Sequence, residues 1–525
     1  MNYKQVLHSF FLRATSENNI QKVKEFLDNY KMVFNLNKKN NDGSNPLILA
    51  TINNNIEMVQ LLIDYANKKN IVLEINEKNN YGCNPLILAT SKNNIEIVQL
   101  LIEYANKNDI ILEINEKNNY GDNPLILATS KNNIEIVQLL IEYANKNDII
   151  LEINEKNNYG DNPLILATSK SNIEIVQLLI EYVNKNDIIL EINEKNNRGS
   201  NPLLWATDKN NIEMVQLLMD YANKNDIILE INEKNNRGSN PLILATSKNS
   251  IEIVKLLIDY ANKNNIILEI NEKNNYGCNP LIWATDKNNI EMVQLLMDYA
   301  NKNDIVLEMN EKSEKRNNPL MLATDKNNIE MVQLLIDYAN KKNITLEINE
   351  KTEIGSNPIY SAISGNNFEI FKLLVKYSVE RKIKIIINEK DIEELISKNF
   401  SFVRLKNISE INPEFIKLIY EYRDKNINEV IFNGNSYIFK QIIEYLENEK
   451  KEKEKIKKDF EQIEKDLENE KRKKERIEND LENEKRKKER IENDLENEKR
   501  EKERIENDLE NEKREKERIE NDLEN

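Results

Sequence analysis

The residue types that carry most enzyme chemistry are scarce in this chain of 525 residues, which has one histidine, His8, and two cysteines, Cys83 and Cys278. A structural zinc site needs about four cysteine or histidine ligands, and a serine or cysteine nucleophile usually needs a neighbouring base. The single imidazole lies in the leader segment, where we expect a partly exposed residue of an end cap. Glycine-rich phosphate loops such as GxGxxG are also absent. We therefore predict that the protein is not an enzyme and has no catalytic residue, no cofactor and no metal site.

Charge and hydropathy exclude two further classes of partner. The chain has 91 acidic and 75 basic residues and a net charge of −16, whereas nucleic-acid binders normally show a basic balance or a basic face. No stretch approaches the roughly 18 uninterrupted apolar residues of a membrane-spanning helix, and the first residues lack a signal-peptide core. We predict no nucleic acid and no membrane as partner. The expected compartment is the cytoplasm, with the nucleus as the alternative.

The chain is built from a repeat of 39 residues. Nine of its ten prolines keep this step: Pro46, Pro85, Pro124, Pro163, Pro202, Pro241, Pro280, Pro319 and Pro358. Seven of the ten glycines follow the same step, from Gly43 to Gly277. Cys83 and Cys278 occupy one repeat position five units apart, which is about 50 Å if the units stack like packed helices. They cannot form a disulfide with each other at that distance.

The first half of a unit predicts a turn and a short helix. One unit reads NYGDNPLILATSKNNIEIVQLLIEYANKNDIILEINEKN and begins at Asn119. Gly121 marks a turn that favours a positive φ. Asn123 is a suitable N-cap, and Pro124 suits the first helical position. Asn132 tolerates the left-handed conformation that ends a helix.

The second half predicts a second helix and an extended return. Apolar residues recur at helical spacing at Ile134, Val137, Leu140 and Ile141. A short β-prone run follows at 149–153, and the chain then returns to the next turn. One unit cannot bury its apolar faces alone, but a stack of nine units can.

These motifs resemble the ankyrin repeat. NPLILAT stands where that family shows Thr-Pro-Leu-His-x-Ala-Ala, NNIEIVQLL where it shows Gly-His-x-Glu-Val-Val-x-Leu-Leu, and INEKNNYG where it shows Val-Asn-Ala-x-Asp-x-x-Gly. The resemblance implies an all-α solenoid of helix–turn–helix repeats with short extended fingers. Six extra residues follow the second helix, and Ala144 replaces the glycine expected to end it, so we expect that helix to run one turn longer. Ile126 replaces the signature histidine, which exchanges a polar contact between repeats for apolar packing.

The ends of the array and the tail differ from the repeats. We predict an N-terminal capping repeat at 1–39, nine units at 40–390, degenerate capping helices at 391–446 and a charged tail at 447–525. Roughly 70% of the tail is charged, without glycine or proline, and a 14-residue unit recurs in it. Its apolar residues alternate at spacings of 4 and 10, with charged residues such as Glu484 and Lys488 at the intervening core positions. The tail is a coiled coil of two or three copies, a single helix supported by i,i+4 ion pairs, or disordered.

Two positions vary against a near-constant background. The residue before the turn glycine is tyrosine or arginine through the middle of the array, and these are the candidate partner-binding residues: Tyr81, Tyr120, Tyr159, Arg198, Arg237 and Tyr276. In the ankyrin family these positions lie at or near the fingertips that contact partners, and such residues dominate interface hot spots. The alternative to partner binding is that these residues vary through evolutionary drift at an exposed loop. At the end of the first helix, serine in early repeats gives way to aspartate in Asp208 and Asp286.

Two tryptophans, Trp205 and Trp283, replace a leucine of the first helix. We expect them to pack within or between repeats, with an exposed anchor as the alternative. The sequence thus predicts a non-enzymatic protein–protein interaction scaffold whose tail spaces it or joins it to copies of itself. The alternatives are a structural spacer without a discrete partner and an adaptor for an enzyme on another chain.

Overall fold

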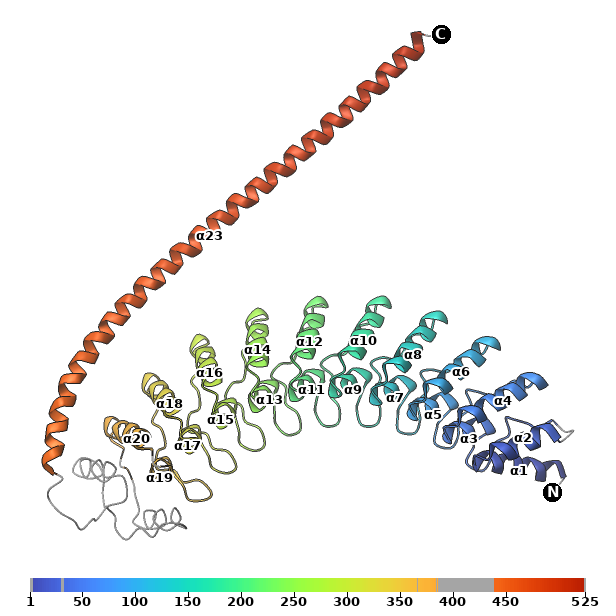
Figure 1. The fold of residues 1–525 in the computed structure, drawn as a ribbon, viewed down its shortest axis with the longest axis horizontal. Coiled ribbons are helices and arrows are strands. Elements are labelled where there is room, and N and C mark those ends of the chain that lie inside the picture. The colour runs from blue at the N-terminus through green and yellow to red at the C-terminus, as the bar shows by residue number, and fades with distance from the viewer. Residues whose placement is uncertain (1–2, 30–32, 366, 384, 386–438, 524–525) are drawn as a thin grey trace. The chain divides into compact units, whose positions relative to one another are not determined.

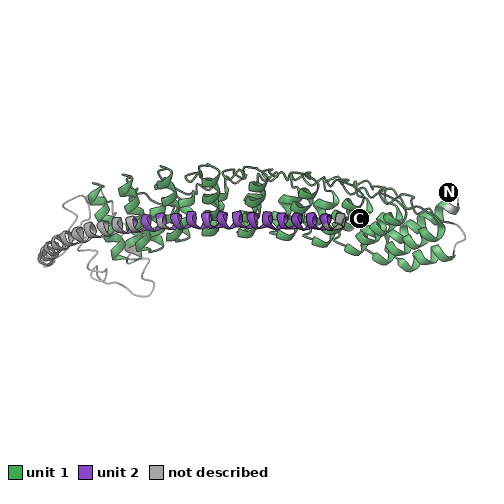
Figure 2. Cartoon of the chain, turned by 90° about the horizontal axis from the view of Figure 1, so that it is seen from above, with its two compact units in different colours: residues 1–430 green, residues 431–525 purple. Residues whose placement is uncertain are grey.

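The structure, a computed structural model, describes most of the chain: residues 3–29, 33–365, 367–383, 385 and 439–523. It divides into two compact units, 1–430 and 431–525, each of which is described by itself (Figure 2). Every regular element within the described ranges is a helix and none is a strand. Within the first compact unit, from residue 46 to 380, short helices follow the inner side of a curved row and longer ones the outer side (Figure 1). The predicted all-α solenoid is confirmed.

The helices between Tyr3 and Glu380 follow one another in pairs. The first helices of the pairs are α1 (Tyr3–Ser16), α3 (Pro46–Ile52), α5 (Pro85–Ser91), α7 (Pro124–Ser130), α9 (Pro163–Ser169), α11 (Pro202–Asp208), α13 (Pro241–Ser247), α15 (Pro280–Asp286), α17 (Pro319–Asp325) and α19 (Pro358–Ser364). The second helices are α2 (Ile20–Asn29), α4 (Ile56–Lys69), α6 (Ile95–Lys107), α8 (Ile134–Lys146), α10 (Ile173–Lys185), α12 (Ile212–Lys224), α14 (Ile251–Lys263), α16 (Ile290–Lys302), α18 (Ile329–Lys341) and α20 (Phe368–Glu380). We number the repeat units from one to nine, starting with α3.

The helices of unit three begin and end where the sequence signals indicate. The Asn123 side chain caps α7 by accepting a hydrogen bond of 2.8 Å from the Ile126 amide, and Pro124 is the first residue of the helix. Asn132 adopts the expected left-handed conformation with φ of 59°. Helix α8 continues past the buried Ala144 to Lys146, so its predicted extension is confirmed. Local chemistry therefore determines the helix boundaries in this unit.

The fingers between units stack through their backbones. Gly121 has φ of 78°, as the turn requires. The Asn158 amide of the next finger donates a hydrogen bond of 2.9 Å to the Tyr120 carbonyl. The same bond recurs in the next pair of fingers, from the Asn197 amide to the Tyr159 carbonyl. The finger residues are thus held at a constant place from one unit to the next.

The extra residues after the second helix are extended but form no strand in the described part of the array. Side chains of neighbouring units satisfy their backbone groups instead. The Tyr182 hydroxyl of the following unit accepts a hydrogen bond of 2.9 Å from the buried Leu151 amide. The Asn115 side chain of the preceding unit donates to the Ile150 carbonyl at 2.7 Å and accepts from the Glu152 amide at 3.1 Å. The longer repeat is therefore stabilised by contacts that cross between units.

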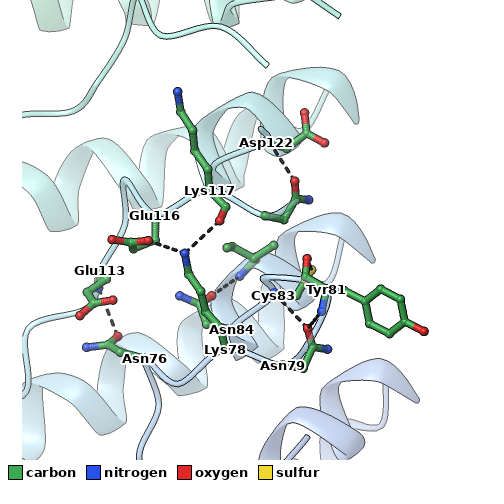
Figure 3. Close-up of polar contacts among 12 residues, drawn as sticks. Asn76, Lys78, Asn79, Tyr81, Cys83, Asn84, Glu113, Glu116, Lys117 and Asp122 are labelled. Carbon is green, nitrogen blue, oxygen red and sulfur yellow. Dashed lines mark hydrogen bonds and ion pairs between the residues drawn. The ribbon is translucent and has the colours of Figure 1, made fainter. Parts of the chain in front are cut away.

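Ion pairs join successive fingers in the same way (Figure 3). The Lys78 ammonium pairs with the Glu116 carboxylate and donates to the Lys117 carbonyl at 2.9 Å. Equivalent pairs recur along the array, for example Lys117 with Glu155 at 2.6 Å. These side chains are partly exposed, so each pair contributes little alone, but the row fixes the register of the stack.

The N-terminal pair α1 and α2 closes one end of the array, and it corrects one expectation. His8 is 4% exposed and not partly exposed. Its ring lies 6.0 Å from that of Phe11 and 5.9 Å from that of Phe34, measured between centroids. Burial, followed by the charge of Lys38, lowers the pKa of His8. The reason is the aromatic cluster of this cap, which encloses the imidazole.

In the second compact unit, 431–525, the described residues form one long helix, α23 (Phe439–Leu523). It begins before residue 447, where the predicted tail starts. The other capping helices, predicted within 391–446, lie outside the described residues. Exposed i,i+4 ion pairs recur among its described side chains with the 14-residue period, as in Glu482–Arg486, Glu496–Arg500 and Glu510–Arg514. Its apolar side chains, such as Ile491 and Leu495, are 65% and 55% exposed. The tail is helical, in agreement with both rod interpretations and not with disorder.

Candidate partner-binding groove

The six candidate residues occupy one place in successive fingers. Tyr81 is 63% exposed, Tyr120 59%, Tyr159 61% and Tyr276 49%. Arg198 and Arg237 are exposed at the equivalent positions. An asparagine two residues earlier, such as Asn79 for Tyr81, accepts a hydrogen bond from the backbone amide and fixes the turn. The Tyr81 ring points away from the neighbouring finger contacts (Figure 3), so it does not support the core.

Three of these residues line a groove of about 880 Å³ that crosses units five to eight. Arg198, Arg237 and Tyr276 form its finger edge, and Lys315 continues that edge in unit eight. The lining does not include Tyr81, Tyr120 or Tyr159, which belong to units two to four. We call the six candidate residues the finger row. Only the second half of this row borders the groove.

The floor of the groove is apolar and contains both tryptophans. Trp205 and Trp283 are half-buried, and Trp283 packs against a buried cluster of Cys278, Ile282 and Leu322. Neither indole Nε1 has a hydrogen-bond partner, although both atoms are buried. Leucine occupies the equivalent position in unit six, between them. The tryptophans thus combine packing between repeats with an accessible ring surface.

The helix edge of the groove is partly acidic. Asp208 and Asp286 lie at the ends of α11 and α15 and line the groove. The Asp208 carboxylate pairs with Lys248 at 3.2 Å. In contrast, the structure records no ion pair for Asp286 within the described ranges. The variation at the helix end, predicted as a separate feature, therefore faces the finger row across one groove.

The cysteines show no sign of activation. Both thiols are free. Burial raises the pKa of Cys83, and burial together with the carboxylates of Asp286 and Glu314 raises that of Cys278 to about 11. A thiol with a raised pKa is a poor nucleophile at neutral pH.

Metal-ligating side chains do not gather in the part of the chain that the structure describes. Those residues contain no cluster of three His, Cys, Asp or Glu side chains able to hold a metal ion. Among the described helices, none is both long and apolar enough to cross a membrane.

Sequence reasoning found the components of the groove but not their arrangement. The tyrosine and arginine row, the tryptophans and the serine-to-aspartate change were separate signals. All three signals coincide in units five to eight, and that coincidence could have indicated one surface. Ser200 and Ser239, the residues after the turn glycines of units five and six, also line the groove.

Comparison with known proteins identifies the family. The model of ankyrin repeats (3 copies) matches seven overlapping ranges: 11–111, 72–151, 109–189, 148–228, 188–266, 226–306 and 302–387. Together they run without a gap from 11 to 387, which is more than half of the chain. The chain belongs to the ankyrin repeat family.

A solved structure, the ankyrin repeat domain of Bcl-3, described as a unique member of the IkappaB protein family, is 22% identical to this chain. The match covers 49% of this chain and 99% of that one, with a TM-score of 0.35. No curated protein matches the sequence. Ankyrin repeats are interaction modules, so the chain is a protein-interaction scaffold.

Proposed function

We propose that the scaffold is non-enzymatic and binds a protein partner along the finger row, with the groove of units five to eight as its central contact surface. The clustering of Arg198, Arg237 and Tyr276 opposite Trp205 and Trp283 is the observation that supports this most strongly. Tryptophan, tyrosine and arginine are the residues most enriched at hot spots, which lie in well-packed pockets. The floor supplies apolar area and the finger edge supplies exposed charge, which is the usual composition of an interface core and its rim.

Serine substitutions along the row test this function. The groove variant carries Arg198→Ser, Arg237→Ser and Tyr276→Ser, and the early-row variant carries Tyr81→Ser, Tyr120→Ser and Tyr159→Ser. Each side chain is exposed, so we expect the free energy of unfolding to change by only about 0.5 kcal/mol per site. Partner binding should weaken by about 30-fold or more in the groove variant, since truncating one hot-spot residue costs about 2 kcal/mol.

The measurement is capture of proteins by the full-length chain, followed by affinity measurement on the partner found. Lys255→Gln is the matched control, because it also removes an exposed cation but lies on α14, away from the groove. A groove variant that binds as tightly as the parent would contradict the assignment of the groove. If both serine variants bind like the parent, the finger row is not the contact surface.

For the tail, we propose that α23 joins copies of the chain through its stripe of isoleucine and leucine. Ile491 and Leu495 each expose more than half of their surface in the single helix, and a coiled coil would cover them. Sedimentation of the full chain should show mass rising with concentration. The variant Ile491→Lys, Leu495→Lys should stay monomeric while keeping its helix content by circular dichroism. A parent chain that is strictly monomeric at all concentrations would instead assign the tail as a spacer.

A further inference from the structure

The finger edge of the groove is basic on balance, with Arg198, Arg237 and Lys315 against Glu314. The helix edge carries Asp208 and Asp286 against Lys248. In the part of the chain that the structure describes, no carboxylate pairs with the guanidinium of Arg198 or Arg237. Across the groove, Asp208 pairs with Lys248 at 3.2 Å, whereas no ion pair is recorded for Asp286 among the described residues. A ligand with carboxylates on one side only would place them toward the fingers, because the helix edge repels a second acidic row.

The step between fingers selects the conformation of such a ligand. Neighbouring units stack about 10 Å apart, as packed helices do. A polyproline II helix has three residues per turn and rises 3.1 Å per residue, so every third side chain returns to the same side after about 9 Å. A β-strand of three residues has a similar length, but its side chains alternate between faces. An α-helix matches this step only at every seventh residue.

The tryptophans suit the same ligand. Polyproline II segments dock in grooves lined by aromatic rings. Trp205 and Trp283 are two units apart, or about 20 Å, which corresponds to two turns of that helix. Their buried indole N–H groups lack partners, and six of the other seven repeats carry leucine at this position, so the repeat fold does not require tryptophan there. Lys209 and Lys287 lie over the two rings, 6.0 Å and 5.7 Å from their centroids. Because both tryptophans are only half-buried, ring surface remains for contact with a ligand.

We propose that the groove of units five to eight binds a proline-rich acidic segment of a partner protein in the polyproline II conformation. A carboxylate at every third position pairs with the finger edge at Arg198 and Arg237, and proline rings stack on Trp205 and Trp283. Three steps between four units span about 30 Å, which about ten residues of such a segment cover. This inference rests on the proposed function, since it names the chemistry of the partner for the same groove.

Synthetic peptides of 18 residues test the proposal with the full-length protein. The probe is six repeats of Pro-Pro-Glu. Six repeats of Pro-Pro-Lys keep the conformation and reverse the charge, and six repeats of Gly-Gly-Glu keep the charge and lose the preformed helix. The chain has two tryptophans in all, and both line the groove, so intrinsic fluorescence reports binding there directly. We expect saturable binding of Pro-Pro-Glu that weakens with added salt, and affinities at least about tenfold lower for both controls.

Repeat-derived substitutions locate the site. Arg198→Tyr with Arg237→Tyr, which introduces the residue of the neighbouring fingers, should weaken binding of labelled Pro-Pro-Glu by about tenfold or more. Trp205→Leu with Trp283→Leu, followed by peptide anisotropy, should do the same. Lys255→Gln should change affinity by less than about twofold. If the tryptophan variant fails to fold, the arginine variant still tests the site.

Three outcomes would overturn the inference: no binding of Pro-Pro-Glu, equal binding of Pro-Pro-Lys, or tighter binding of a helical peptide with glutamate at every seventh position. None of them would overturn the proposed function, which depends on capture of a partner by the same surface. Conversely, peptide binding that the arginine and tryptophan variants leave unchanged would remove the site assignment, while the capture experiment would still decide whether the finger row binds proteins.

Discussion

Replacing Tyr260 by phenylalanine should destabilise the array by about 1–3 kcal/mol, since a buried amide left unsatisfied costs that much. The Tyr260 hydroxyl accepts a hydrogen bond of 2.9 Å from the Leu229 amide and donates one of 3.4 Å to the Ile227 carbonyl. Tyr260 and Leu229 are 4% and 1% exposed, so water cannot replace the lost partner. The midpoint of urea unfolding, followed by the fluorescence of Trp205 and Trp283 in the flanking units, should fall accordingly.

Tyr159→Phe is the matched control, because it deletes the same oxygen from a finger side chain that is 61% exposed. Its effect should stay within about 0.5 kcal/mol. Equal midpoints for the two variants would mean that the hydroxyl row does not stabilise the extended segments. Since the same bond recurs at Tyr104, Tyr143, Tyr182 and Tyr221, the result applies to the longer repeat as a whole.

The local parts of the fold could be predicted from the sequence because their causes are local. The finger turn follows from Gly121, the cap from Asn123, and the helix end from Asn132. The tyrosine bridge could not be predicted, because Tyr182 and Leu151 lie 31 residues apart and meet only after two units stack. From the sequence alone, Tyr182 looks like any other apolar residue of a helix, and nothing indicates that its hydroxyl binds the Leu151 amide. The burial of His8 was missed for the same reason, since Phe34 reaches it from outside its own helix.

For the candidate site, too, some features are determined within one repeat and others only by the stacking of several repeats. Variation within a near-constant repeat indicated the residues Arg198 and Trp205 individually. Their joint placement depends on the depth of the groove between fingers and first helices, which no single repeat encodes. The exposed early row, from Tyr81 to Tyr159, gave an equally strong sequence signal but lies outside the groove. Composition at a fingertip therefore predicts exposure, whereas the residues of the adjoining first helix decide whether a groove lies beside it.

A Cβ atom at Gly199 should disrupt the finger stack more than any single exposed change. Gly199 has φ of 71°, and an added Cβ would lie 2.9 Å from the backbone nitrogen of Asn236 in the next finger. The left-handed conformation costs an alanine about 1–2 kcal/mol, and the overpacking adds about 1–3 kcal/mol. Gly199→Ala should therefore lower the free energy of unfolding by about 2–5 kcal/mol, measured again by urea unfolding with tryptophan fluorescence.

Gly355→Ala separates these two costs. Gly355 has φ of 83°, but an added Cβ would meet no described atom within 4 Å, so only the conformational cost of about 1–2 kcal/mol remains. The chain already accepts that cost at the finger turn of unit eight, where Arg316 takes the glycine position with φ of 59°. If Gly199→Ala is no worse than Gly355→Ala, the fingers do not contact each other through their backbones. A clear excess for Gly199→Ala would show that close finger stacking, and not the turn alone, requires glycine in the middle of the array.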